Sequence, residues 1–141
     1  MSSKKELASL YRQKYNSSFK QAKAYDSQRA DVLAKIERLE SAKKKLDVQL
    51  QNIQNIKSND FSRLTKLDES QFKGSIQRKF LTEVKQAESK LDTYKSEHEK
   101  NKSQIDEKIN ELQKEADSLQ RRSAMAYTEA DAYLSLSYQM M

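Results

Sequence analysis

The chain of 141 residues contains one glycine, Gly74, and no proline. Glycine and proline most often end helices and form tight turns, so a chain this poor in both has little material for loops. Hydrophobic residues make up 35% of the sequence and charged residues 34%, a balance that disfavours a thick globular core. The sequence therefore predicts an all-α protein built from long helices.

The first half of the sequence carries an apolar stripe with the four-three spacing of a helix seam. Two cations interrupt it, and its members are Tyr25, Arg29, Val32, Ile36, Leu39, Lys43, Leu46, Leu50 and Ile53. Upstream the spacing is looser, although Leu7, Tyr11 and Ala22 extend the same face. We predict a first helix over about 4–57.

A second stripe begins at Phe80 and continues through Val84, Ala87, Leu91, Tyr94, His98, Asn101 and Ile105. The best apolar series then becomes Ile109, Leu112, Ala116, Leu119, Ser123, Ala126, Ala130 and Tyr133. This slip of four residues predicts a stutter, which locally unwinds a supercoil. We predict a second helix over about 70–137, with His98 and Asn101 forming a polar layer that fixes its register.

The charge balance differs between the two predicted helices. Residues 1–57 hold 13 Lys or Arg against 6 Asp or Glu, whereas residues 81–141 hold 9 against 12. This difference favours pairing of the first helix with the second, the alternative being a solvated charged surface without pairing preference. We predict an elongated, antiparallel, coiled-coil-like hairpin that forms a single domain over 1–141, with its bend in 58–79.

The predicted bend concentrates apolar side chains between the two stripes, namely Phe61, Leu64, Leu67, Phe72, Ile76 and Phe80. Asn59 or Asp60 could cap a short helix inside this bend. Gly74 would supply backbone freedom at the turn into the second helix, where a residue with a Cβ could be strained. In the simplest interpretation, Phe72 fills the bend and Gly74 relieves strain without a partner.

The stretch FKGSIQRKF at 72–80 carries a family resemblance. Phe72-Lys73-Gly74 resembles the Trp-x-Gly turn of small WXG-like proteins of type VII secretion, with Phe in place of Trp. The whole stretch is similar to the turn of the YwqH-like family, helical proteins associated with LXG toxins. The resemblance implies a non-enzymatic accessory protein that binds the helical N-terminal region of an LXG-type toxin, alone or with a second small helical partner, and promotes its export. The partner-binding residues would be Phe61, Leu64, Leu67, Phe72, Gly74 and Phe80.

Type VII substrates commonly carry a Tyr-x-x-x-Asp/Glu signal in the helix after the glycine turn, and Tyr127 and Asp131 fit this spacing. Residues four apart share a helix face, so a receptor could read the phenol and the carboxylate together. We regard the pair as an export-signal candidate. The alternative is a tyrosine at the edge of the core beside a surface aspartate.

The C-terminal segment has few charges and gathers Tyr133, Leu134, Leu136, Tyr138, Met140 and Met141. In a hairpin it would lie near the N-terminus, so we expect it to pack on Leu7, Leu10 and Tyr11 or to bind a partner. A second functional hypothesis follows from this patch. The chain could be a structural or adaptor coiled coil that self-associates through its C-terminal segment.

Other functions find little support in the composition. The chain has no cysteine and one histidine, so few of its side chains are suited to catalysis or metal binding. We therefore expect no enzyme, no cofactor and no metal site. The pI near 9.4 suggests nucleic acid, but Lys43 to Lys45 form the only triple basic run, and we rank nucleic-acid binding last. Neither a bilayer-spanning segment of about 20 apolar residues nor an apolar signal segment is evident. We expect no membrane insertion and a cytoplasmic location, or co-secretion without a cleaved signal.

Overall fold

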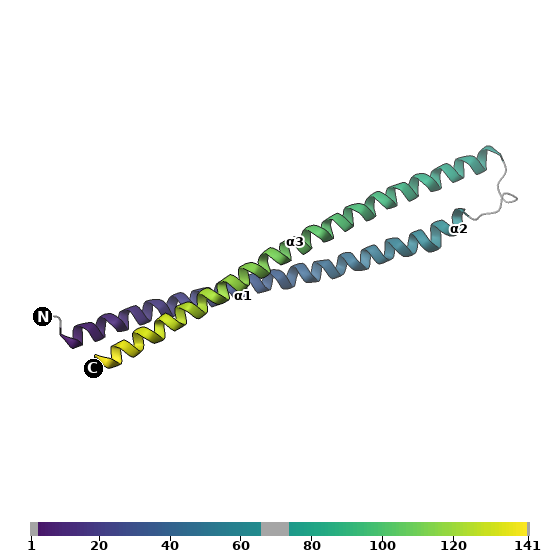
Figure 1. Cartoon of the computed structure of the whole chain (residues 1–141). Coiled ribbons are helices and arrows are strands. Elements are labelled where there is room, and N and C mark those ends of the chain that lie inside the picture. The colour runs from purple at the N-terminus through teal and green to yellow at the C-terminus, as the bar shows by residue number, and fades with distance from the viewer. Residues whose placement is uncertain (1–2, 66–73, 141) are drawn as a thin grey trace. The chain divides into compact units, whose positions relative to one another are not determined.

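A computed structural model describes residues 3–65 and 74–140 of the chain (Figure 1). Helix α1 spans Lys4–Asn55, a π-helical segment spans Ile56–Phe61, α2 spans Ser62–Thr65, and α3 spans Ser75–Gln139. The described residues contain no strand. Because α1 and α3 pack against each other, the predicted all-α helical hairpin is confirmed.

Ion pairs between α1 and α3 show that the two helices are antiparallel. Two such pairs join Lys43 to Asp106 at 2.6 Å and Asp47 to Lys102 at 2.5 Å, and a third pair joins Lys57 of the π-helical segment to Asp92 at 2.8 Å. The four residues from Lys43 to Asp47 correspond to four residues back along α3, and the ten residues from Asp47 to Lys57 correspond to ten residues back. The register therefore stays constant over this stretch.

The helix pair divides into two compact units. We call Met1–Arg38 with Ile109–Met141 the terminal unit, and Leu39–Lys108 the bend unit. In Figure 1 the start of α1 and the end of α3 lie close together in the terminal unit, as an antiparallel pair requires. Each unit contains one stretch of α1 and one stretch of α3, and we describe each separately.

Small side chains form much of the core of the terminal unit. The buried residues of α1 are Ala8, Ser18, Ala22, Val32 and Ile36, and those of α3 are Leu112, Ala116, Leu119, Ser123, Ala126, Ala130 and Ser137. Alanine and serine allow two helix backbones to approach closely, since the distance between helix axes depends on the side chains at the contact. The few larger residues contribute most of the apolar burial, about 1.5–3 kcal/mol for a fully buried Leu, Ile or Val.

The α1 seam agrees with the sequence prediction. Every predicted position from Tyr25 to Ile53 is buried or half-buried, and so are Leu7, Tyr11 and Ala22 upstream. The four-three spacing also includes Ala8, Tyr15 and Ser18, so the pattern toward the N-terminus is regular where the sequence suggested that it was loose. The four-three repeat was difficult to recognise from the sequence because small and aromatic residues hold these positions.

The predicted α3 seam is correct at Val84, Leu91, His98 and Ile105, whereas the predicted positions between these four, and the stutter, are wrong. Ala87, Tyr94 and Asn101 are exposed, so Asn101 forms no seam layer with His98, which is half-buried. The four-three spacing runs without a slip through Val84, Glu88, Leu91, Lys95, His98, Lys102, Ile105 and Ile109.

The physical reason is that long charged side chains occupy seam positions. Their methylene groups can cover apolar surface while the charged end reaches a polar acceptor. Lys102 pairs with Asp47, and Lys95 Nζ lies 3.4 Å from Gln54 Oε1. Because the prediction preferred apolar residues, it passed over these charged residues and selected the exposed positions beside them.

The predicted helix cap at Asn59 or Asp60 is also wrong, because the chain remains helical there. Asn55 and Ser62, on either side of the π-helical segment, both have right-handed helical dihedral angles. Ser58 Oγ donates a hydrogen bond of 2.8 Å to the Gln54 carbonyl, which supports the helix across the junction. A π-helical turn accommodates an extra residue without ending the helix.

Gly74 adopts the conformation that the sequence predicted. Its φ angle is 73°, in the left-handed region that residues with a Cβ rarely enter, and α3 begins at the next residue. A Cβ added there would meet no atom within 4 Å, so the need for glycine lies in the backbone. Phe72 and Lys73, and with them the remainder of the predicted Phe-x-Gly bend, lie outside the described residues.

Candidate functional site

A polar cluster links α1 and α3 within the terminal unit. The Asp26 carboxylate accepts a hydrogen bond from Ser123 Oγ at one oxygen and from Tyr127 Oη, 2.9 Å away, at the other. The bond from Ser123, and then the bond from Tyr127, lower the pKa of Asp26 because they stabilise its charged form. The bond to Asp26 raises the pKa of the Tyr127 phenol. The cluster favours an ionised aspartate and a protonated tyrosine.

The two residues of the export-signal candidate differ in their surroundings. Tyr127 is half-buried, and its ring meets Phe19 edge-on with centroids 5.8 Å apart. Its hydroxyl is bonded to Asp26. Asp131, one turn further along α3, is exposed. A receptor could therefore reach the carboxylate of Asp131 directly, whereas the Tyr127 hydroxyl already has an intramolecular partner.

Aromatic residues bring the ends of α1 and α3 together in the terminal unit. Tyr11 stacks on Tyr133 with centroids 6.3 Å apart, and Lys14 Nζ lies 5.4 Å from the centroid of Tyr133. This contact confirms the predicted packing of the C-terminal segment on Tyr11. Leu10 is 44% exposed, so it does not share fully in that packing.

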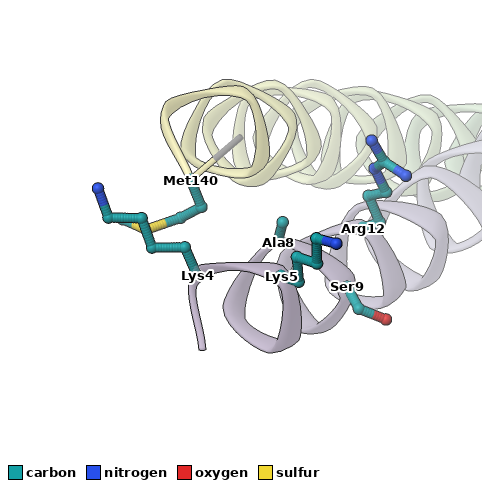
Figure 2. Close-up of a pocket in the computed structure, with 6 residues that line it drawn as sticks. All are labelled: Lys4, Lys5, Ala8, Ser9, Arg12 and Met140. Atoms are coloured by element: carbon teal, nitrogen blue, oxygen red, sulfur yellow. The ribbon is translucent and has the colours of Figure 1, made fainter. Parts of the chain in front are cut away.

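A basic hollow lies where the start of α1 meets the end of α3, and sequence analysis did not anticipate it (Figure 2). Its volume is about 600 Å³, and its lining residues are Lys4, Lys5, Ala8, Ser9, Arg12 and Met140. Three of these residues are cations and none is an acid. The lining therefore combines three cations with the apolar side chains of Ala8 and Met140.

The residues predicted to bind a partner at the bend are only partly described. Phe61, in the π-helical segment, and Phe80, in α3, are each half-buried, and Gly74 is exposed. Leu64 lies in α2. Leu67 and Phe72 lie outside the described residues, so the predicted apolar cluster is represented by Phe61 and Phe80.

The seam of the bend unit is incompletely covered. Among residues 39–63, 74 and 78–108, only Ile53 and Val84 are apolar side chains that are fully buried. The other apolar seam residues are half-buried, namely Leu39, Leu46, Leu50, Leu81, Leu91 and Ile105. Charged residues share the seam, including Lys43 on α1 and Glu88 on α3. Two helices therefore leave much of this apolar seam partly open to water.

The two flanks of that seam differ in charge. On the first flank, carboxylates pair with seam lysines across the helices, as in the contacts of Asp47, Asp92 and Asp106. The second flank consists of the residues that immediately precede every other seam position, so its members are seven residues apart along each helix. We call it the uncharged flank. Over 42–56 and 80–101 its members are Ala42, Gln49, Ile56, Phe80, Ala87, Tyr94 and Asn101, and Lys108 continues the same series on α3 beyond them. Equivalent flanks of antiparallel helices face each other, so these residues border one side of the seam.

A search against models of protein families finds no match to this sequence, and a search against curated proteins finds none. Within residues 3–65 and 74–140, no helix is long and apolar enough to cross a bilayer. The same described residues contain no group of three or more His, Cys, Asp or Glu side chains that could hold a metal ion.

Proposed function

We propose that this chain is a non-enzymatic helical adaptor that binds a helical segment of another protein through its bend unit. The observation that carries the proposal is the incomplete burial of the bend-unit seam, where Ile53 and Val84 alone among the described apolar residues are fully covered. A helix pair buries one seam, and a further helix packed beside it completes a bundle.

Apolar burial supplies the driving force for such binding. Completing the burial of one half-exposed leucine contributes about 1 kcal/mol, at roughly 25 cal/mol per Å². Several half-buried seam residues, such as Leu46, Leu50 and Leu91, are therefore needed to offset an association cost of about 4–15 kcal/mol. This balance of free energies favours a helix of several turns, rather than a short peptide, as the partner.

The more specific form of the proposal follows from the resemblance of Phe72-Lys73-Gly74 to the Trp-x-Gly turn. In this form the partner is the helical N-terminal region of an LXG-type toxin, and the adaptor promotes its export by a type VII secretion system. The adaptor pairs with the toxin in the cytoplasm and leaves with it by a route that needs no cleaved signal. The half-buried Phe61 and Phe80 at the described ends of the bend support a contact there.

Self-association is the second candidate function. Met125 is 72% exposed and Tyr138 is 64% exposed, and both belong to the α3 stretch of the terminal unit. Two copies could bury these side chains against each other. The formal net charge of +6 opposes such a homodimer, because both copies carry it.

Co-expression with the product of the neighbouring large open reading frame separates the two functions. We expect a stable hetero-complex whose mass, measured by light scattering after size exclusion, contains both chains. Leu91→Ala should weaken the complex, because it removes a half-buried apolar side chain from the seam of the bend unit. A homodimer that forms equally well without the neighbouring protein would support self-association instead.

A further inference from the structure

We propose that the uncharged flank of the bend unit is the docking groove for one amphipathic helix of net negative charge from another protein. This inference rests on the proposed function and names the surface and the chemistry of the partner. The flank begins at Ala42 and ends at Ile56 on the α1 side, which corresponds to about 21 Å of helix at about 1.5 Å per residue. A partner helix of about four turns covers that length.

One helix fits because only one side of the seam is open. On the opposite flank, seam lysines and carboxylates already bridge the two helices, as the Lys43 to Asp106 and Lys57 to Asp92 contacts show. A helix docked there would have to displace these ion pairs. Over 42–56 and 80–101 the uncharged flank has no charged residue to displace, so a third helix completes a three-helix bundle on that side.

The uncharged flank also carries exposed anchors for a partner. Ile56 is 39% exposed and Tyr94 is 45% exposed. The Tyr94 ring lies against the seam residue His98, with ring centroids 4.0 Å apart. A large aromatic ring held in this way is the type of side chain that most often dominates binding energy at protein interfaces.

The chemistry of the flank defines the partner's apolar stripe. Gln49 and Asn101 offer amide groups but no charge, so a charged residue pressed against the flank would be buried without a counterion. The stripe must therefore consist of apolar residues with serine, threonine or amide side chains among them. Charged residues of the partner belong on its edges and outer face.

Charge selects an acidic partner over a second copy of this chain. The chain carries a formal net charge of +6, which attracts an acidic helix and repels another copy. Next to the flank, α1 presents Lys45, whereas α3 presents Glu83, Lys90 and Glu97. An acidic edge of the partner is thus best placed over α1.

Two synthetic helical peptides of about 21 residues test the inference. Both carry the same leucine and serine stripe, and their remaining positions hold glutamate in one peptide and lysine in the other. By fluorescence anisotropy, the full chain should bind the glutamate peptide at least about tenfold more tightly than the lysine peptide. Sedimentation should give one peptide per chain. Equal affinities would overturn the charge assignment.

Tyr94→Lys locates the binding surface, with Ser96→Lys on the exposed outer face of α3 as the matched control. Tyr94→Lys should weaken binding of the glutamate peptide by about tenfold or more, although the added lysine increases long-range attraction to it. Ser96→Lys should leave binding within about twofold of the unmodified chain. Ile56→Lys provides a second test from the other side of the flank, and circular dichroism checks the helicity of each variant.

Unchanged peptide binding in both Tyr94→Lys and Ile56→Lys would overturn the inference. So would a homodimer of the unmodified chain that Tyr94→Lys converts to a monomer, because a second copy would then occupy the flank. If the hetero-complex of the co-expression experiment survives Tyr94→Lys, the flank assignment fails and the proposed function stands. If the peptide binds at the flank but no toxin complex forms, the toxin assignment fails and the flank assignment stands.

Discussion

The Tyr127 hydroxyl donates a hydrogen bond to the Asp26 carboxylate across the terminal unit, with 2.9 Å between the two oxygens. Tyr127 therefore contributes to the pairing of α1 with α3, whether or not a receptor also reads it. The neighbouring Ser123 donates to the other oxygen of the same carboxylate. The cluster thus couples helix pairing to the ionisation of a single aspartate.

We expect the stability of the chain to fall in acid partly through Asp26. Its hydrogen bonds hold the folded-state pKa below the ordinary value of 3.8, so its contribution is fully present above that value. The contribution is lost as the pH falls through the folded-state pKa. Asp26→Asn should therefore make the dependence of Tm on pH shallower below about pH 4, as measured by circular dichroism.

Ser123→Ala is the companion variant for this measurement, because it removes the bond with the largest effect on the pKa and keeps the carboxylate. It should also make the pH dependence shallower, to a smaller extent than Asp26→Asn does. If both variants keep the slope of the unmodified chain, the Asp26 cluster does not contribute to acid stability.

Export provides a test of the Tyr127 and Asp131 pair. Asp131 is exposed, so Asp131→Ala should leave folding and toxin pairing intact while it lowers the amount of toxin secreted by the native host. Tyr127→Phe serves as the matched variant, since it keeps the ring and removes the bond to Asp26. Secretion at the normal level with both Tyr127 and Asp131 replaced by alanine would show that these residues serve packing alone.

Gly74 should be difficult to replace, because its φ angle of 73° lies in the left-handed region. Gly74→Ala is expected to lower the free energy of unfolding by about 1 kcal/mol, and Gly74→Asn by less, since asparagine enters this region more readily. Urea denaturation followed by circular dichroism measures both. Equal stability of the alanine variant would mean that the chain adopts another turn at no cost.

Hydrogen exchange should distinguish the two units. The terminal unit buries a continuous row of α3 residues from Leu112 to Ala130, whereas the bend unit fully buries Val84 alone on its described α3 stretch. Amides of α3 within 84–105 should therefore exchange faster than those within 112–130, because local opening there exposes less buried surface. Binding of the proposed partner helix should slow exchange in the first range. Uniform protection along α3 would contradict this expectation.

The sequence predicted the α1 seam well because apolar residues hold most of its positions, from Val32 to Ile53. On α3 it missed Glu88, Lys95 and Lys102, which hold seam positions that an apolar criterion rejects. One signal could have located them. Counting back in steps of seven from Ala116 gives Ile109, Lys102, Lys95 and Glu88, and thus an unbroken repeat.

The Asp26 cluster could not have been predicted in the same way. Ser123 and Tyr127 lie 97 and 101 residues from Asp26, so their contact depends on the register between α1 and α3. Apolar repeats alone permit several registers, each shifted by seven residues. The polar pairs that select one register are evident only after the two helices are placed together.

The side chains in the seam of the terminal unit are small, and they limit the size of the side chains that a helix paired with α1 can carry there. Ala22 and Ala130 are 0% and 1% exposed, so neither position has room for a longer side chain. A foreign helix with leucines at the matching positions would overpack this region, at a cost of about 1–3 kcal/mol for each poorly accommodated side chain. Exchange of helices between molecules is accordingly restricted, in the terminal unit, to helices that share its alanine and serine pattern. This restriction disfavours mispairing with leucine-rich coiled coils.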